Sequence, residues 1–496
     1  MSEQVELRPP TQARPATDRL GFRGGVLGAL VAPAVFLVGV VAYFVVFGVF
    51  DMNALTASGA VGILLAGLLS RNYSRFWAAV VDGVASKTSV LLLLVLLMVS
   101  LVSALIGQAG VSDGFVWLAT SLGVSGGGFT LAAFLIACAI AVSTGTSIGT
   151  LFTVFPILYP AGAVLGADPA LMAGAILSGA LFGDNLAPIS DSTIVSASTQ
   201  RYRRIAGSAD IGGVVKARAK YALVAAAIAG VLFLVVGSAR ATDVQGSTGT
   251  TGSPLSLLML VPIALLLVTA VVKRDIFLAT TVGLVSGLVV ALASGLIAPA
   301  DIINTTDDGN AGGLLVTGIA DTLPLIGVGI VVFGIIGVLT DAGIFDMIVD
   351  GIAKAPFSRT PVGAELSIGA GAVVTATVFA GVNGPSMMMF GPVADRIGAR
   401  AGLHPYRRAN VMDCFTLGLG SIVPVVSSFL LIAALLTQGG RAPEVTALQV
   451  FPATFYPLVL TVVALVAVLT GWGRRFEGEG GAPVRTRPEG LSSSVA

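Results

Sequence analysis

The chain has 496 residues, of which 55% are hydrophobic and only 11% are charged, and its formal net charge is +1. Such a composition indicates a protein that crosses a lipid bilayer several times, and the balanced charge gives no sign of a nucleic-acid partner. The single histidine rules out a multi-histidine metal site, and no Gly-x-x-x-x-Gly-Lys-[Ser/Thr] loop is present to bind ATP. We therefore expect no cofactor and a function that draws on ion gradients.

In chain order, residues 1–25 are polar and carry several arginines and prolines, which predicts a disordered tail rather than a cleavable signal. A series of apolar segments follows, each long enough to cross the roughly 30 Å of bilayer hydrocarbon. Residues 473–496 are again polar and predict a second disordered tail. The apolar segments lie at 27–49, 53–70, 88–109, 129–159, 168–199, 218–238, 254–272, 276–298, 323–340, 361–395, 405–437 and 447–471.

Basic residues in the connecting loops orient these segments, because lysine and arginine accumulate on the cytoplasmic side of a membrane. Cations gather in several loops, notably at 200–220, and this distribution predicts that both tails are cytoplasmic. Segments 129–159 and 361–395 must then return to the side from which they enter, as re-entrant hairpins. The segments that follow them, 168–199 and 405–437, are predicted to cross as broken helices.

The two halves of the apolar core, 26–238 and 254–472, are predicted to be inverted repeats joined by an extracytoplasmic linker at 239–253. An odd number of crossings in each half turns the second half upside down. Prolines at a constant spacing of 236 residues support the repeat. The matched pairs are Pro156 and Pro392, Pro169 and Pro405, and Pro188 and Pro424. The predicted fold class is an all-α polytopic membrane protein with about 10 crossings plus two re-entrant hairpins in two inverted-topology repeats.

The most informative polar stretch, residues 183–193, lies inside the apolar segment at 168–199 and reads Gly-Asp-Asn-Leu-Ala-Pro-Ile-Ser-Asp-Ser-Thr. Its two carboxylates, Asp184 and Asp191, have no cationic neighbour in this segment, and a carboxylate at membrane depth costs at least ~2.5 kcal/mol. Pro188 has no backbone N–H, so it leaves the carbonyl of Asp184 without its helical partner. Three hydroxyl groups complete an oxygen-rich pocket that suits sodium ions and protons. They belong to Ser190, Ser192 and Thr193.

Small and polar residues interrupt three further apolar segments and predict helix breaks at 143–147, 381–385 and 418–424. Carriers built from inverted repeats bind their substrate near the middle of the membrane, where broken helices of the two repeats meet. We therefore expect side chains at the two hairpin tips to act as oxygen ligands. They are Thr144, Thr146 and Ser147 in the first hairpin, and Asn383 and Ser386 in the second.

Asp413 lies in the second broken helix and is a candidate second-repeat carboxylate for the same site. The alternative is that it forms an ion pair with Arg407 or Arg408 near the cytoplasmic surface. His404 stands between two apolar segments and precedes a proline, so we expect it in a loop.

At these residues the chain resembles the NhaC family of sodium/proton antiporters. The motif Gly-Asp-x-x-x-Pro-x-Ser-Asp-[Ser/Thr]-Thr occurs at 183–193, and Thr-Gly-Thr-Ser-x-Gly-Thr occurs at 144–150. The resemblance implies a carrier in the cell membrane that exchanges sodium for protons by alternating access, with sodium at Asp184 and Asp191. Asn185 stands where many members carry lysine, and we include it among the expected site residues. Carriers of this kind are commonly homodimers, but the sequence shows no interface signature.

The main alternative is a sodium- or proton-coupled carrier of a small organic acid or amino acid, because the family also includes exchangers of small organic acids. An anionic substrate favours a cation in its pocket, whereas the core motifs contain no arginine or lysine. Arg218 is assigned to the cytoplasmic loop at 200–220 with the other cations. These observations favour an inorganic cation as the substrate. An enzyme is disfavoured because the sequence offers no nucleophile–base pair and no metal-binding cluster.

Overall fold

The structure is a computed structural model that describes residues 19–47, 51–111, 114, 117, 126–242, 254–273, 275–305, 309–344, 347, 360–424, 426–437 and 442–488. These residues are almost entirely helical, which confirms the predicted all-α class. Their strands form two short antiparallel hairpins. One pairs β1 (Asn304–Thr305) with β2 (Ala311–Gly312), and the other pairs β3 (Phe476–Glu477) with β4 (Pro483–Val484).

Six of the described helices are long and apolar enough to cross a membrane, and the number rises to seven if one bent pair forms a single span. The bent pair joins Ala447–Ala453 to Phe455–Thr470 at an angle of 52°. Most predicted apolar segments coincide with helices, although two helices begin well before the predicted segments, at Ile211 and Leu314. The number of crossings, the inversion of the repeats and the sidedness of the loops remain predictions.

The chain folds into two compact units, each made from two stretches of sequence. The first unit comprises Met1–Val90 and Gly327–Ile348, and the second comprises Leu91–Ile326 and Val349–Ala496. Residues 1–18, most of the first predicted tail, lie outside the described residues. Most of the predicted linker at 239–253 lies outside them as well.

Small residues hold the helices of the first unit close together. Gly59 faces Val331, and Gly83 faces the backbone of Gly337, so that two helices approach the later part of a third. The helices of this unit are α1 (Val26–Ala29), α2 (Val31–Val40) with its π-helical continuation η2 (Val41–Val46), α3 (Met52–Leu69), α4 (Tyr73–Val84) and the later part of α15 (Leu314–Asp341).

The helix α4 has no counterpart among the predicted segments. It is only 12 residues long, and its apolar side chains share the helix with charged ones, so it lacks the continuous apolar run of a span. Asn72 caps it by accepting a hydrogen bond from the backbone N–H of Arg75 at 3.0 Å. The Arg75 side chain then pairs with Asp341 of α15 at 2.9 Å.

The second unit begins with α5 (Lys87–Gln108), most of which lies in this unit, and continues through a helical hairpin and a broken helix. Asp168 and Asp210 cap two of these helices by accepting backbone hydrogen bonds, which fixes where each helix begins. The hairpin is α7 (Gly126–Thr144) with α8 (Ser147–Val164), the broken helix is α9 (Pro169–Leu186) with α10 (Asp191–Ser198), and α11 (Ile211–Arg240) follows. Shorter helices come next: η3 (Pro254–Met259), α12 (Leu260–Lys273), α13 (Ile276–Ala293) and α14 (Pro299–Ile302).

The later part of the second unit repeats the order of hairpin, broken helix and long helix. The hairpin is α17 (Pro361–Val378) with α18 (Asn383–Arg400), and the broken helix is α19 (Pro405–Leu417), η5 (Leu419–Ile422) and α20 (Ser428–Leu435). The bent pair α21 (Ala447–Val450), η6 (Phe451–Ala453) and α22 (Phe455–Thr470) follows. Gly145 and Gly381 turn the two hairpins with φ of 70° and 80°, a backbone conformation that favours glycine.

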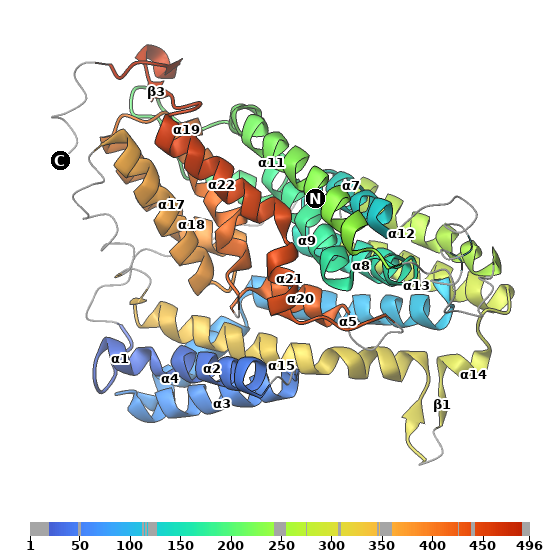
Figure 1. Ribbon diagram of the computed structural model, residues 1–496. Coiled ribbons are helices and arrows are strands. Elements are labelled where there is room, and N and C mark those ends of the chain that lie inside the picture. The colour runs from blue at the N-terminus through green and yellow to red at the C-terminus, as the bar shows by residue number, and fades with distance from the viewer. Residues whose placement is uncertain are drawn as a thin grey trace, which may run out of the picture. The chain divides into compact units, whose positions relative to one another are not determined.

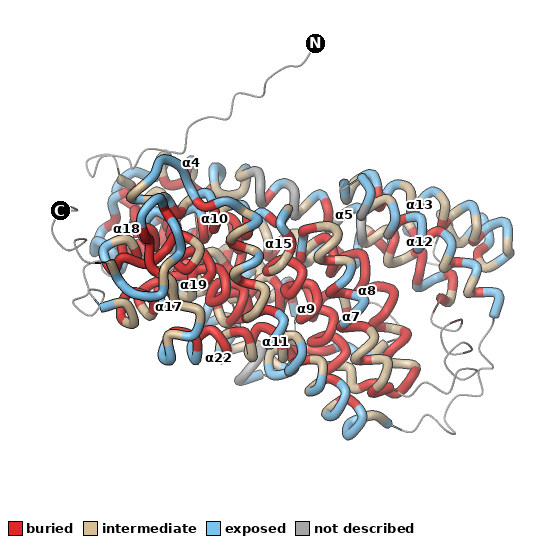
Figure 2. Tube along the Cα trace, turned by 90° about the horizontal axis from the view of Figure 1, so that it is seen from above, coloured by how far each residue is buried: buried red, intermediate tan, exposed pale blue. Residues whose placement is uncertain are grey.

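The two halves interlock at their broken helices. The helix α10 packs against α18, and α20 packs against α8, so each half touches the hairpin of the other. In Figure 1, α11 and α22 run side by side, as their contacts also show. Figure 2 shows α8, α9 and α19 largely buried, and 89% of the apolar window of α9 and α10 is buried against 28% for α11. The broken helix α9–α10 is therefore central, whereas much of α11 faces outward.

Residues 473–488, predicted to belong to a disordered tail, are instead folded. The β3–β4 hairpin contains Phe476, which forms a bridge with Leu403, and Glu477, which is 3% exposed and accepts hydrogen bonds from the N–H groups of Arg203 and Arg204. A polar segment can fold when its charged groups find buried partners, and this pattern is not visible in composition.

His404 lies in the short connection between α18 and α19, as expected, but it is fully buried there and caps α19. Its Nδ1 accepts a hydrogen bond from the backbone N–H of Tyr406 at 3.1 Å, and burial lowers the pKa of the imidazole.

Candidate functional site

Asp184 lies near the end of α9 and is enclosed by neutral hydrogen-bond donors. The residue is only 2% exposed. Ser147 donates to its Oδ2 at 2.9 Å, and the Asn383 amide donates to the same oxygen at 3.2 Å. Ser190 and Ser192 donate to Oδ1, the latter at 3.3 Å. The predicted pocket of carboxylate and hydroxyl oxygens is therefore assembled around Asp184.

The break between α9 and α10 arises from the sequence as expected. Pro188 cannot donate to the carbonyl of Asp184, and the Ser192 hydroxyl takes this role at 3.1 Å. The next carbonyl, that of Asn185, accepts a hydrogen bond from the Arg218 guanidinium at 2.6 Å. Side chains thus satisfy the end of α9, and the chain can turn inside an apolar environment without leaving polar groups unpaired.

The four predicted helix breaks meet around this carboxylate. Ser147 comes from the tip of the first hairpin, and Asn383 comes from the tip of the second. Ser421, in the second broken helix, donates to the Asn383 Oδ1 at 2.8 Å and so orients the amide toward Asp184. Two breaks from each half therefore contribute to one pocket.

Asp413 pairs with neither of the arginines proposed from the sequence. Arg407 pairs with Glu365 at 2.8 Å, and Arg408 pairs with Asp395 at 2.7 Å. The partner of Asp413 is Arg218 of α11, whose Nη1 lies 2.8 Å from Oδ2, and both side chains are fully buried.

Two neutral side chains complete the surroundings of Asp413. The Asn185 amide donates to Oδ1 at 2.7 Å, and the Ser196 hydroxyl donates to Oδ2 at 3.0 Å. Tyr456 in turn donates to the amide oxygen of Asn185 at 3.0 Å. Asn185 therefore joins the cluster around Asp413 rather than the pocket of Asp184, although the two residues are adjacent in sequence.

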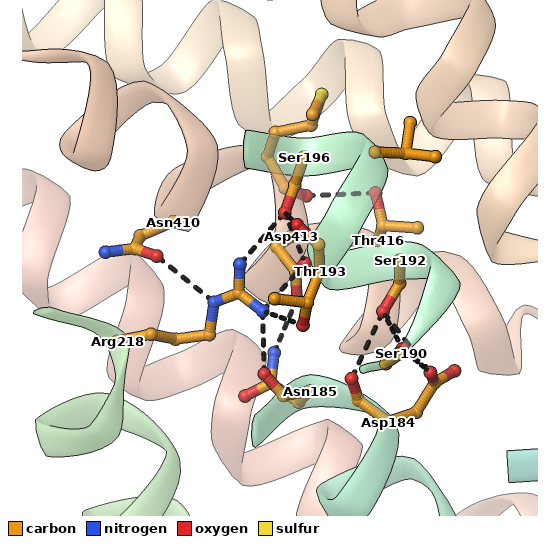
Figure 3. A network of polar contacts seen from close by, with 12 residues as sticks. Asp184, Asn185, Ser190, Ser192, Thr193, Ser196, Arg218, Asn410, Asp413 and Thr416 are labelled. Atoms are coloured by element: carbon orange, nitrogen blue, oxygen red, sulfur yellow. Dashed lines mark hydrogen bonds and ion pairs between the residues drawn. The ribbon is translucent and has the colours of Figure 1, made fainter. Parts of the chain in front are cut away.

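Arg218 is the member of this cluster that the sequence analysis did not include, because it was assigned to a cytoplasmic loop. The helix α11 begins at Ile211, so Arg218 lies two turns inside it. Figure 3 shows its guanidinium at the centre of a group of polar side chains. Its hydrogen-bond acceptors are Asn410 Oδ1 at 3.1 Å, Asn185 O at 2.6 Å, Thr193 Oγ1 at 3.1 Å and Ser196 Oγ at 3.0 Å. Asp210 caps α11 by accepting the backbone N–H of Gly213. An aspartate at this position is the sequence signal that could have placed the start of the helix before Arg218.

Asp191 occupies a different environment from Asp184. It lies in the first turn of α10 and is exposed, and its Oδ1 accepts the backbone N–H of Ser192 at 2.8 Å. Its Oδ2 lies over Gly384, where a Cβ atom would approach it within 2.7 Å. Asp191 therefore lies at the tip of the second hairpin, next to Asn383, which donates to Asp184, and sodium binding by both carboxylates stays a prediction.

Three other expected ligands hold the hairpin tips instead of contacting Asp184. Thr144 donates to Ile140 O at 3.0 Å, and Thr146 caps α8 by accepting the N–H of Gly149 at 3.2 Å. Ser386 is buried and donates to Asn383 O at 2.8 Å. These hydrogen bonds shape the loops that position Ser147 and Asn383.

Comparison with known proteins supports the resemblance drawn from the motifs. The model of the Na+/H+ antiporter family matches residues 22–238. A malate-2H(+)/Na(+)-lactate antiporter of Bacillus subtilis is 28% identical over 350 residues, which are 66% of this chain and 71% of that protein. The Na(+)/H(+) antiporter NhaC of Alkalihalophilus pseudofirmus is 27% identical over 239 residues, which are 46% of this chain and 50% of that protein. The resemblance to the NhaC family is thereby confirmed.

Two solved transporter structures show a weaker likeness. The YdaH transporter of Alcanivorax borkumensis is 14% identical and has a TM-score of 0.38, with 82% of this chain and 91% of that chain covered. MtrF of Neisseria gonorrhoeae is 12% identical and has a TM-score of 0.35, with coverage of 84% and 85%.

Proposed function

We propose that this chain, which is related to the Na+/H+ antiporter family over residues 22–238, is a membrane carrier that exchanges sodium ions for protons. The observation that carries the proposal is the pocket of Asp184. It holds a buried carboxylate whose hydrogen-bond partners are all neutral. A buried charge needs a partner of opposite sign, and here a mobile cation or a proton has to supply it.

Competition for one carboxylate gives the exchange. Sodium binds the ionised form of Asp184, and protonation removes the negative charge and releases the ion. The surrounding hydroxyls suit both states, because each can donate to the empty carboxylate or turn its oxygen toward a cation. The hydroxyls of Ser147, Ser190 and Ser192 can therefore become sodium ligands without a change in the backbone.

The Arg218–Asp413 pair supports a cation rather than an organic anion as the substrate. The core motifs contain no arginine or lysine, which favoured a cation as the substrate. The structure nevertheless places Arg218 of α11 beside the pocket. Its guanidinium is nevertheless engaged by Asp413 and by four hydrogen-bond acceptors. A substrate carboxylate would have to displace these partners.

Alternating access is the proposed mechanism of transport. Helix breaks from both halves surround Asp184, so tilting of one hairpin against the other half would open the pocket to one side at a time. Asp191 is exposed at the start of α10, and its place in the same break suits a first binding point for an arriving cation. The carrier would lie in the cell membrane with both termini in the cytoplasm, and it needs no chemical step on its substrate.

A second candidate follows from the similarity to the malate-2H(+)/Na(+)-lactate antiporter. In this alternative, sodium or protons at Asp184 would drive the transport of a small organic acid. The Asp184 pocket would have the same role, and the two functions differ in whether an organic anion crosses the membrane.

The proposal is tested with the purified full chain in liposomes that contain a pH-sensitive dye. Sodium added against a preset proton gradient should move protons through the wild type and not through Asp184→Asn. The matched control is Asp168→Asn, the same change at the opposite end of α9, where asparagine can still cap the helix. If folded wild-type protein moves protons only when malate or lactate is added, the second candidate replaces the first.

A further inference from the structure

An open cleft with a basic lining lies where the chain leaves α22. Its volume is about 560 Å³. Four of its lining residues are cationic and none is acidic. The cationic residues are Lys220, Arg474, Arg475 and Arg485.

Little of this positive charge is neutralised by the protein. Arg474 pairs with the buried carboxylate of Glu365 at 2.8 Å and also donates to the carbonyl of Val468, which caps the end of α22. Among the described residues, no carboxylate forms a salt bridge with Lys220, Arg475 or Arg485. The cleft therefore holds an excess of positive charge that suits an anion.

The backbone positions these cations at the edge of an apolar surface. The ammonium of Lys220 stands 4.8 Å from the ring centre of Tyr221 and lies against Gly473, which has φ of 71°. Trp472 also lines the cleft and is 40% exposed, although its ring packs edge-on against Tyr221 at 5.0 Å. An exposed tryptophan beside basic residues at the end of an apolar helix is typical of the membrane–water interface.

Exposed apolar faces of two neighbouring helices lead up to the cleft. On α22 the exposed side chains recur at helical spacing and end next to Trp472, and on α11 a similar face begins just after Lys220. The residues are Val462, Leu465, Val466 and Leu469 on α22, and Val224, Ile228, Val231 and Val235 on α11. The helices α11 and α22 pack together (Figure 1). Their apolar faces can therefore contact the acyl chains of a lipid while the cleft contacts its charged headgroup.

We propose that this cleft binds the phosphate headgroup of an anionic phospholipid. The charge requires an anion, and the adjoining apolar faces and Trp472 favour a lipid over a free phosphate ion in solution. Basic pockets between membrane helices bind anionic headgroups through the same combination of contacts. This inference does not depend on the identity of the transported ion.

Native mass spectrometry of the purified full chain tests the proposal, with phosphatidylglycerol, phosphatidylcholine and inorganic phosphate as separate probes. Phosphatidylglycerol should bind most tightly. Lys220→Gln and Arg485→Gln should each weaken its binding roughly fivefold, since each basic residue near a headgroup contributes a comparable attraction. Matched controls are Lys216→Gln, one turn earlier on α11, and Arg487→Gln, two residues after Arg485. Neither control residue lines the cleft, so both variants should bind like the wild type.

Three outcomes would overturn the proposal. Equal loss in the control variants would show that binding reflects general surface charge. Equal binding of phosphatidylcholine would show that the net charge of the headgroup is irrelevant. Binding of inorganic phosphate as tight as that of phosphatidylglycerol would identify a free anion as the ligand. Arg485 is exposed, so its variant keeps the test valid if Lys220→Gln fails to fold.

Discussion

Asp413 and Asp184 are both buried, but they differ in whether the protein supplies a positive partner for the carboxylate. Asp413 has a fixed positive partner, because Arg218 lies 2.8 Å away and both side chains are fully buried. Asp184 is buried to nearly the same extent, yet among the described residues no lysine or arginine forms an ion pair with it. The charge of Asp413 is balanced by the protein itself. In the proposed exchange, the charge of Asp184 is balanced by a sodium ion or by a proton.

The largest expected effect concerns Asp184, where replacement by asparagine removes the unbalanced charge. Transport of sodium and protons should be lost, because an amide carries no negative charge and does not gain or lose a proton near neutral pH. The folded protein should be at least as stable as the wild type without sodium, since a buried unpaired carboxylate is costly. Proteoliposome transport and thermal unfolding in detergent measure the two properties. A large loss of stability would contradict the claim that Asp184 lacks a fixed partner.

The opposite pattern is expected for Asp413 and Arg218. Arg218→Gln leaves a buried carboxylate unpaired and should lower the free energy of unfolding by about 3–5 kcal/mol. Adding Asp413→Asn should restore much of this loss, because the double variant contains no buried charge at this position. Chemical denaturation of the wild type, both single variants and the double variant gives the coupling energy. Simply additive losses would mean that the two charges do not balance each other.

A smaller effect is expected from single hydroxyl groups. Ser147→Ala removes one donor to Asp184 and one proposed sodium ligand, and the apparent affinity for sodium should fall roughly fivefold, since one hydrogen bond contributes about 1 kcal/mol. Ser143→Ala is the matched control at the same hairpin tip, because the Ser143 hydroxyl donates to Ala139 O in its own helix. The sodium concentration for half-maximal proton movement is the measurement. Equal affinities for the two variants would remove Ser147 from the site.

The smallest effect concerns His404, which lies outside the proposed site. Its pKa is lowered by burial, so the unfolded chain binds more protons and the stability falls as the pH drops below about 6.5. His404→Asn keeps a side-chain acceptor for the cap of α19 and removes the titration. Melting temperatures at pH 7.5 and 5.5 should fall more for the wild type than for this variant. The same drop in both proteins would assign the pH dependence to other groups.

The sequence was sufficient to predict the helix breaks and the side chains that contact Asp184, although it also assigned to this pocket Asn185 and three hairpin residues that have other partners. Glycine, proline, serine and aspartate are unusual inside long apolar segments, so the breaks at 143–147, 183–191, 381–385 and 418–424 were visible in a single chain. A break exposes backbone groups that need partners, and this requirement brings the breaks together. The contacts of Asp184 with Ser147, Ser190, Ser192 and Asn383 agree with that reasoning.

The Arg218–Asp413 pair could not be found in the same way. An arginine near the end of an apolar segment has the same local sequence whether it lies in a loop or reaches into the protein. Its partner is in the other half of the chain, and only the packing of α11 against α19 brings the two together.

The most direct test of the account is sodium binding to the purified protein as a function of pH, in the wild type and in Asp184→Asn. Competition for one carboxylate predicts that the apparent Kd for sodium rises about tenfold for each unit of falling pH in the acidic range. It also predicts that Asp184→Asn binds no sodium at any pH. Sodium affinity that does not change with pH, or that survives in the variant, would contradict the claim that Asp184 is the site where sodium and protons compete.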